Sequence, residues 1–260
     1  IKIRGVSASL SGYVWIDAAA TVDIDYAEFY NLGSATTNKR GIDIQTTTGS
    51  CNIQYSSIYN CTNASAVGVY ISGATANNIT FSNNVTWNIA TNHFLIDATS
   101  GTTITVNNNL MMKNVTASSV IAQLNDVGFT FTNNTCVSAT ADNIRLSEAS
   151  GSTIGTFSGN TSHSSASVGL RINNGIVGTI DTMTSWRETA NGIWRNSNNE
   201  NMGFVSGQLI ISNAVVFGCG VTNLGSAGNC GVPIRFISCT INGGVTQVSP
   251  RGWSPTTAAN

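Results

Sequence analysis

The chain has 260 residues, of which 41% are hydrophobic and only 9% are charged, and its formal net charge is −1. So few charges argue against a nucleic-acid partner, which needs clustered Lys and Arg, and against a polybasic membrane patch. No run approaches eighteen apolar residues, so no membrane insertion is expected. The sequence opens on Ile1 without a signal peptide, which we interpret as a mature or excerpted piece of a longer polypeptide.

A repeated pattern begins early in the chain. Residues 24–31 (IDYAEFYN) align with residues 53–60 (IQYSSIYN) at a step of 29, so this unit holds a longer loop, which we place at Gly33 to Arg40. Both runs are rich in apolar and aromatic residues with polar residues between them, which is typical of short strands.

The pattern is most regular between Asn77 and His163. Residues 78–84 (NITFSNN) return as residues 103–109 (TITVNNN) and 128–134 (GFTFTNN), and a shorter copy follows at residues 156–160 (TFSGN). Self-similarity at such a period indicates a repeat architecture. The last asparagine of the motif recurs in steps of 25, 25 and 26 residues, at Asn84, Asn109, Asn134 and Asn160.

A second apolar segment runs in phase with this motif. In each copy two flanking residues are expected to point inward and the central residue outward. The central residues are Asp43, Tyr70, Leu95, Ile121, Arg145, Arg171 and Trp194. Tyr70, Leu95 and Ile121 would then form an apolar outer stripe, followed by two stacked arginines. A contiguous patch of this kind indicates a partner chain, unless the tail or an absent part of the chain covers it.

Each unit consists of short runs rich in Ile, Val, Phe and Thr, separated by Asn, Gly and Ser, and no window has a sustained helical period. A unit of about 25 residues is too short for a propeller blade and lacks the leucine pattern of a leucine-rich repeat. We therefore predict an all-β fold, a right-handed parallel β-helix with coils of about 25 residues. The alternative is a β-sandwich in which the asparagine bias arises by chance.

Successive coils of a β-helix stack equivalent residues at the strand spacing of roughly 4.8 Å. Asn84, Asn109, Asn134 and Asn160 are therefore predicted to form an asparagine ladder, in which side-chain amides hydrogen-bond along the stack.

The repeat becomes less regular after residue 200. Residues 197–201 (SNNEN) indicate a long turn, and further strands are expected at residues 209–211 and 234–237. Residues 249–260 contain two of the three prolines and are expected to leave the coil. We predict a single β-helix domain at residues 1–248 and a C-terminal tail at residues 249–260.

A β-helix lyase or hydrolase would need two or three carboxylates, or a carboxylate with Arg or Lys, in one groove. The twelve carboxylates form no obvious acid/base pair in sequence. Asp23, Asp25 and Glu28 lie in one early coil, whereas Asp181, Arg187 and Glu188 lie in a later one and are candidates to approach Arg171. His93 and His163 are almost three coils apart and cannot share a metal. We predict no catalytic residue, no cofactor and no metal site.

The six cysteines show no zinc-type spacing. Cys219, Cys230 and Cys239 cluster near the C-terminus as candidate disulfide partners, and Cys51 and Cys61 form a second near pair. Disulfides would imply an oxidising, extracellular setting. The other interpretation is that these cysteines are buried small hydrophobic residues.

Glycosylation sequons are the one recurrent modification signal. Asn60, Asn63 and Asn114 are the better candidates for N-glycosylation. Asn84 and Asn133 also begin sequons, but they lie in the repeated Asn-Asn turn, where an inward side chain cannot carry a glycan.

Four stretches carry a resemblance to a known series: residues 28–33 (EFYNLG), 40–44 (RGIDI), 57–61 (SIYNC) and 83–88 (NNVTWN). Over residues 20–115 the chain resembles the parallel β-helix region of fibrocystin-like proteins and of related cell-surface hyaluronan-binding and hyaluronan-cleaving proteins. The resemblance implies a secreted or membrane-anchored ectodomain. The cleaving branch carries an Arg-Tyr-Pro-Ile-His-type motif where this chain has residues 39–43 (KRGID), so the histidine is missing here. The resemblance therefore implies an extracellular scaffold and not hyaluronan cleavage.

We expect a non-enzymatic extracellular or cell-surface structural protein, part of a coat, appendage or filament. Its expected partners are further copies or further domains of the same polypeptide, with carbohydrate as another candidate. The alternatives are a carbohydrate-active β-helix enzyme and a phage tailspike or fibre. A groove with several carboxylates within about 10 Å would favour the enzyme, and N-glycans would exclude the phage protein.

Overall fold

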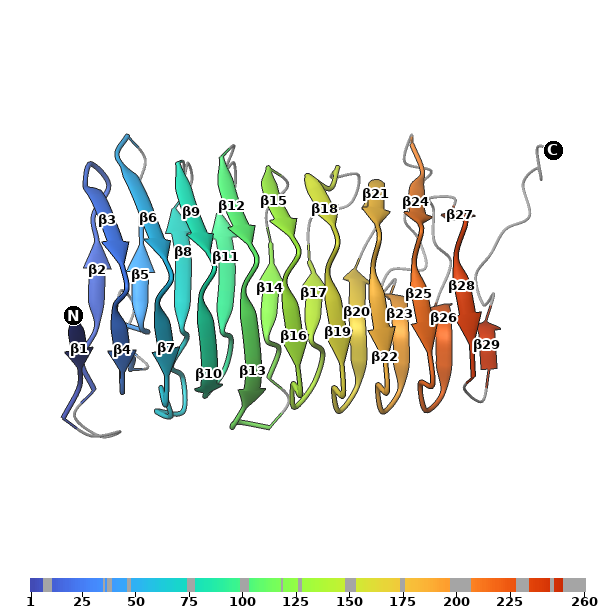
Figure 1. Ribbon diagram of the computed structural model, residues 1–260, viewed down its shortest axis with the longest axis horizontal. Coiled ribbons are helices and arrows are strands. Elements are labelled where there is room, and N and C mark those ends of the chain that lie inside the picture. Colours follow the sequence, from blue (N-terminus) through green and yellow to red (C-terminus); the bar gives the residue numbers. More distant parts are fainter. Residues whose placement is uncertain are drawn as a thin grey trace.

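The computed structural model shows an all-β solenoid, which confirms the predicted parallel β-helix (Figure 1). Among the described residues, the strands form three parallel sheets of ten, ten and nine strands. The described residues are 1–6, 11–34, 36, 39–45, 48–73, 78–98, 103–117, 119–125, 128–147, 153–173, 176–196, 207–227, 234–243 and 246–249.

Each coil adds one strand to each sheet in turn. The first sheet contains β1 (Lys2–Arg4), β4 (Glu28–Tyr30), β7 (Ser57–Tyr59), β10 (Val85–Ile89), β13 (Leu110–Asn114), β16 (Thr135–Val137), β19 (Thr161–His163), β22 (Thr184–Trp186), β25 (Val215–Phe217) and β28 (Thr240–Asn242). The second contains β2 (Val14–Ile16), β5 (Ile42–Ile44), β8 (Val69–Gly73), β11 (Phe94–Ala98), β14 (Ala122–Leu124), β17 (Ile144–Leu146), β20 (Val168–Asn173), β23 (Asn191–Asn196), β26 (Thr222–Ala227) and β29 (Thr246–Ser249). The third contains β3 (Thr21–Asp25), β6 (Ser50–Gln54), β9 (Ile79–Ser82), β12 (Ile104–Asn107), β15 (Phe129–Thr132), β18 (Thr156–Ser158), β21 (Gly178–Asp181), β24 (Leu209–Ser212) and β27 (Ile234–Ile237).

The corner between the third and first sheets explains the Asn-Asn repeat. The first asparagine of each pair takes a positive φ, at 57° in Asn83, 56° in Asn108 and 55° in Asn133. Few residues other than glycine adopt this region readily, and asparagine is among the most tolerant. The chain therefore turns at the first asparagine and directs the second one into the core.

The second asparagines form one buried column along the solenoid. The backbone N–H of Asn84 donates to Oδ1 of Asn109 at 2.9 Å, and that of Asn109 donates to Oδ1 of Asn134 at 3.1 Å. The N–H of Asn134 continues to Oδ1 of Asn160 at 2.9 Å. Each Nδ2 donates to a carbonyl of the preceding coil, as Asn109 does to Phe81 at 2.9 Å. The column thus satisfies corner amides that lie away from water.

Stacked apolar side chains fill the interior. On the third sheet the inward column runs through Ile53, Phe81, Val106, Phe131, Phe157, Ile180 and Ile211. These residues are all buried, and the rings of Phe131 and Phe157 stack with their centroids 5.6 Å apart.

The structure corrects one strand of the sequence analysis. The segment predicted at residues 120–122 is shifted by two, because Leu95 pairs with Gln123 and not with Ile121. Both registers place apolar residues inward, Val120 and Ala122 in the predicted one and Ala122 and Leu124 in the observed one. A shift of two residues also leaves the inward and outward faces unchanged, so the alternation of side chains does not distinguish the two registers. Ile121 is fully buried at the corner before β14. At the C-terminal end, pairing continues to Ser249, while the rest of the predicted tail lies outside the described residues.

Replacing Asn109 by Leu is expected to lower the free energy of unfolding by about 2–4 kcal/mol, because the buried Asn84 amide would lose its acceptor. Chemical denaturation would measure the loss. Asn108→Gly is the matched control: Asn108 is exposed and has a positive φ, so this variant should stay within about 1 kcal/mol of the wild type. Equal stability of the two variants would contradict a structural role for the ladder.

Candidate functional site

The apolar stripe expected on the second sheet is not there. Tyr70 is only 7% exposed and Ile121 is buried, so Leu95 alone is partly open to solvent. The prediction of this interface was wrong, because Gln123 replaces Ile121 in the outward column and Tyr70 is covered by polar neighbours.

Those neighbours form a cluster at one end of the second sheet. The Tyr70 hydroxyl donates to Oδ2 of Asp97 at 3.0 Å, and the Arg40 guanidinium lies 4.7 Å from the Tyr70 ring centroid. The Arg40 backbone N–H donates to Oδ2 of Asp43 at 2.9 Å. Burial raises the pKa of Asp43, against the opposing effects of the Arg40 amide and charge. Asp43 is fully buried, so Asp43 and Asp97 are not a carboxylate pair open to a substrate.

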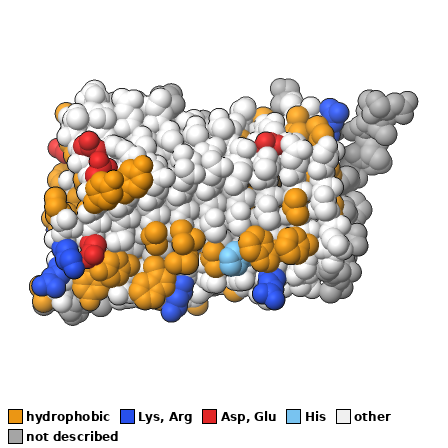
Figure 2. Space-filling model, in the orientation of Figure 1, with side chains coloured by type: hydrophobic (Ala, Val, Ile, Leu, Met, Phe, Trp, Pro, Cys, Tyr) orange, Lys and Arg blue, Asp and Glu red, His pale blue; other side chains and the backbone are white. Residues whose placement is uncertain are grey.

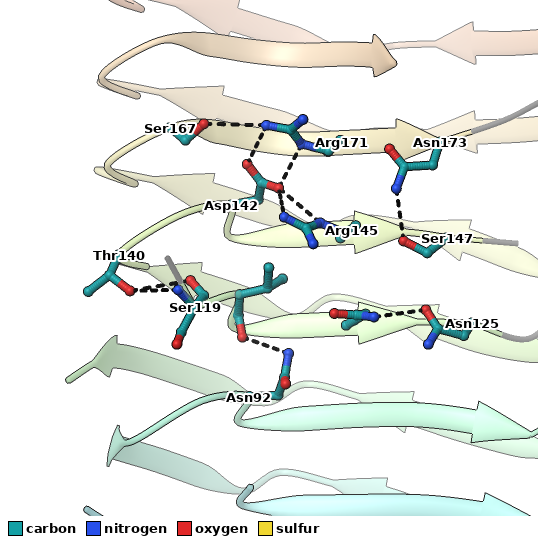
Figure 3. A network of polar contacts seen from close by, with 12 residues as sticks. Asn92, Ser119, Asn125, Thr140, Asp142, Arg145, Ser147, Ser167, Arg171 and Asn173 are labelled. Atoms are coloured by element: carbon teal, nitrogen blue, oxygen red, sulfur yellow. Dashed lines mark hydrogen bonds and ion pairs between the residues drawn. The ribbon is translucent and has the colours of Figure 1, made fainter. Parts of the chain in front are cut away.

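The predicted stack of two arginines is present further along the same sheet, with Arg145 paired in register with Arg171. Both bind one carboxylate, that of Asp142 (Figure 3). Nε and Nη2 of Arg145 lie 3.0 and 2.6 Å from Oδ2 of Asp142. Nε and Nη2 of Arg171 lie 2.7 and 3.1 Å from Oδ2 and Oδ1. The Asp142 side chain has no exposed surface, whereas those of Arg145 and Arg171 are 28% and 23% exposed.

The other notable surface is the outer face of the first sheet, which the sequence analysis did not identify. A column of large side chains, here called the aromatic row, passes through Tyr30, Tyr59, Trp87, Met112, Val137, His163, Trp186 and Phe217. Figure 2 shows hydrophobic side chains gathered along this part of the surface, with a histidine among them. Trp87 and Phe217 are each 40% exposed.

Two groups of rings in the aromatic row are in contact: Tyr30 packs against Tyr59 in a tilted arrangement, and His163, Trp186 and Phe217 stack in series. The centroids of Tyr30 and Tyr59 are 5.3 Å apart, those of His163 and Trp186 are 4.5 Å apart, and those of Trp186 and Phe217 are 5.9 Å apart. The last two rings are almost parallel, at 3°. The sequence contains a signal for this row. Three of the ladder asparagines are followed, three positions later, by a large residue, as Asn84 is by Trp87.

Glu188 and Asp181, two of the carboxylates considered as catalytic candidates, have structural roles. Glu188 is buried and accepts hydrogen bonds from the Ser162 and Ser185 hydroxyls at 2.7 and 3.1 Å and from the Ser165 amide at 2.6 Å. Burial raises its pKa, which these bonds oppose. The expected approach of Glu188 and Asp181 to Arg171 is wrong, since Arg171 binds Asp142 instead.

Asp181 lies near the surface and is held ionised. The hydroxyls of Ser212 and Thr182 and the amide of Asn213 donate to it at 2.6, 2.8 and 2.9 Å. These bonds, that of Ser212 first, lower the pKa of Asp181 to about 2. In the early coil, Glu28 forms an ion pair with Lys2 at 3.1 Å and Asp23 accepts from the Asn52 amide at 2.7 Å. Within the described residues, no group of three or more His, Cys, Asp or Glu side chains is arranged to hold a metal.

The two histidines have different environments. His93 is completely buried, with Nδ1 2.7 Å from the Thr86 hydroxyl and Nε2 3.2 Å from the Lys113 carbonyl. Burial lowers the pKa of His93 to about 3, so its ring is neutral at physiological pH. His163 is half-buried in the aromatic row, and its pKa is lowered by burial and by the positive charge of Arg187.

The disulfide prediction fails for the cysteines that can be assessed. Cys219 and Cys239 hold free thiols, as do Cys51 and Cys61, and Cys230 lies outside the described residues. Burial raises the pKa of both Cys51 and Cys61 to about 12, which makes these thiols unreactive. They are buried small hydrophobic residues.

Among the predicted glycosylation sites, the prediction for Asn114 is wrong. It is 3% exposed and its Nδ2 donates to the Thr91 carbonyl, so a glycan has no room there. Asn60 and Asn63 are half-buried at the surface. Asn133, which the sequence analysis excluded as inward-pointing, is exposed because it is the corner residue and not the ladder residue.

Comparisons with known proteins identify no family for the chain. No family model matches it, and no curated protein does. Two solved structures are similar to it. A mutant of the periplasmic alginate epimerase AlgG has a TM-score of 0.43 and 13% identity over 84% of this chain and 59% of its own length. The pectate lyase Pel9A has a TM-score of 0.38 and 15% identity over 95% of this chain and 70% of its own. Within the described part of the chain, no helix has the length and apolar character needed to cross a bilayer.

His93 is expected to make stability pH-dependent. The unfolded chain binds a proton near the ordinary pKa of 6.5, whereas the folded chain does so only near 3, so stability is lost as the pH falls through this window. The raised pKa of Glu188 has the opposite effect on stability, because the contribution of Glu188 to stability is lost as the pH rises. Denaturation of wild type and His93→Gln at pH 7 and pH 4 separates the two effects: the variant should lose less stability on acidification. An equal loss in both proteins would contradict the buried neutral histidine.

Proposed function

We propose that this chain is a non-enzymatic structural module of an extracellular or cell-surface assembly, and that copies associate laterally through the outer face of the first sheet. The observation that carries the proposal is the aromatic row. It extends over eight coils, or about 34 Å at the spacing of parallel strands. Contiguous exposed apolar surface on this scale marks an interaction site more often than an inert surface.

The stacking of the rings favours a protein partner over a sugar. A sugar ring packs its C–H face against the flat face of an aromatic ring. In the C-terminal part of the row those flat faces are covered by neighbouring rings, as in the pairs His163–Trp186 and Trp186–Phe217. The ring edges are left to solvent, and edges suit interdigitation with other side chains.

A second copy of the chain is the partner that fits best. Beside the C-terminal half of the row lies a column of smaller residues, Thr135, Thr161 and Thr184. Beside its N-terminal half the same column holds Glu28, Ser57, Val85 and Leu110, and Val85 is itself 42% exposed. Antiparallel two-fold packing would place the Trp87 ridge of one copy over the threonine column of the other, at the same repeat of about 4.8 Å. A two-fold interface requires self-complementarity of this kind.

The ends of the solenoid support a larger object as well. Among the described residues, the strands β1, β2 and β3 each have a neighbour on one side only, and so do β27, β28 and β29. Open parallel edges pair readily with further strands unless they are covered. We propose that more of the same polypeptide, or another copy, continues the stack at these edges.

The non-enzymatic part of the proposal rests on the carboxylates. Within the described residues, Asp43, Asp142 and Glu188 are buried, and Asp181 is held by three strong hydrogen bonds. General acid catalysis needs an accessible group with a raised pKa, whereas the pKa of Asp181 is lowered. The resemblance to fibrocystin-like ectodomains supports the same extracellular, structural setting.

Association is expected to depend on the aromatic row. Sedimentation equilibrium should show dimers or larger species of the wild type, and Trp87→Glu should weaken association at least about tenfold by placing a charge in the contact. Trp15→Glu is the matched control, because Trp15 is a 50% exposed tryptophan at the centre of β2 on the second sheet. A monomeric wild type at high concentration, or dissociation caused by Trp15→Glu and not by Trp87→Glu, would refute the proposed interface.

The chain is expected to leave polysaccharides uncut. Incubation with hyaluronan, pectin and alginate should give no new reducing ends and no unsaturated products. Depolymerisation that disappears in Asp181→Asn would instead establish the enzyme hypothesis, because Asp181, unlike Asp43, Asp142 and Glu188, is not buried.

A further inference from the structure

The second sheet carries a positive site that the lateral assembly does not use. Asp142 supplies one negative charge to two guanidinium groups, so the group of three keeps one net positive charge. Asp142 binds the Nε side of both arginines (Figure 3). Within the described residues, Nη1 of Arg145 and Nη1 of Arg171 have no hydrogen-bond partner. The outer edges of both groups are therefore fixed in place and available to a ligand.

Such an arrangement is suited to a carboxylate. A guanidinium presents parallel N–H donors that match the two oxygens of a planar anion. Holding the arginine in advance reduces the side-chain entropy lost on binding. The buried Asp142 provides this constraint, since its carboxylate is bonded on both sides and has no exposed surface.

Trp194 extends the site by one coil. It pairs in register with Arg171 on one side and with Gly225 on the other. A Cβ at position 225 would lie 2.3 Å from Cζ3 of the Trp194 indole. The absence of a side chain at Gly225 therefore lets the indole lean over β26 and away from Arg171. Trp194 is half-buried, and no ring stacks on it among the described residues, in contrast to Trp186.

Polar side chains line the adjacent column. The Asn173 amide donates to the Ser147 hydroxyl at 3.0 Å, and the Gln123 amide donates to Asn125 at 3.2 Å (Figure 3). Hydroxyl-rich ligands are bound by amide and hydroxyl groups that are fixed in this way. The neighbouring groups thus match the hydroxyls of a sugar better than an isolated inorganic anion.

We propose that the outer face of β17, β20 and β23 binds a uronate-bearing saccharide, with its carboxylate at Arg145 and Arg171 and a neighbouring sugar ring on Trp194. The proposal is independent of lateral association, because the aromatic row belongs to the first sheet. A saccharide bound here would attach the assembly to an acidic glycan surface.

Calorimetric titration with a short oligouronate tests the site. Binding should be detected at low salt and weaken in 0.5 M NaCl, because charge interactions at a partly exposed site are screened. Arg145→Gln or Arg171→Gln should lower the affinity at least about tenfold, through loss of a charge-assisted contact. Single substitutions keep Asp142 paired with the remaining arginine, so the fold should be retained. Arg235→Gln is the charge-matched control, because Arg235 is exposed on the third sheet and should bind like the wild type.

Two further ligands and one further variant make each outcome decisive. The same oligomer with its carboxyls reduced to alcohols should bind at least about tenfold more weakly, and sodium sulfate should bind more weakly than the oligouronate. Trp194→Leu should weaken oligouronate binding without changing sulfate binding. Equal affinity for the reduced oligomer, tighter binding of sulfate, unchanged binding in both arginine variants, or no oligouronate binding at all would each overturn the proposal.

Discussion

The solenoid depends on hydrogen bonds at the corner where the third sheet turns into the first. The chain must turn there within two residues, and the amide after the turn is buried. Asparagine meets both requirements, because Asn108 adopts the positive φ while Asn109 accepts the amide of Asn84 and donates to the carbonyl of Phe81. Buried backbone groups left without a partner would each cost about 1–3 kcal/mol. The four-coil ladder therefore fixes the register in which every strand of the central coils stacks.

Much of this fold could be predicted from spacing alone. The ladder asparagines recur at steps of 25, 25 and 26 residues, which favour stacked coils over a β-sandwich, and once they are aligned the strands between them follow. Ile121 shows the limit of prediction from spacing, because in a run of consecutive apolar residues both strand registers bury hydrophobic surface. Only the neighbouring coil, in which Leu95 meets Gln123, decides between them. Only part of the charged group could be predicted. The stacking of Arg145 on Arg171 follows from the repeat period, whereas their shared partner Asp142 lies outside both strands.

Several polar residues in the interior bond to one another, within one coil or between neighbouring coils. Thr86 and His93 bond to each other, and Ser162 and Ser185 both donate to Glu188. All five side chains are fully or almost fully buried, and a similar number of isolated polar groups would be too costly to retain. The sequence analysis considered Glu188 only as a candidate to approach Arg171. Its actual partners are 26 and 3 positions away, and only the first of these distances reflects the coil period.

The outward columns of the first and second sheets can differ in chemistry because the outer faces of a solenoid do not contact one another. An inward residue must fit the core formed by all three sheets, whereas an outward residue contacts mainly the coil above, the coil below and solvent. The first sheet can therefore keep an apolar row from Tyr30 to Phe217 while the second sheet keeps two arginines on one buried carboxylate. Rows of large rings stack on themselves and leave only their edges free, which suits another row of the same repeat. A lone indole beside fixed guanidiniums keeps its surface for a ligand, so the two faces of one rigid body favour different partners.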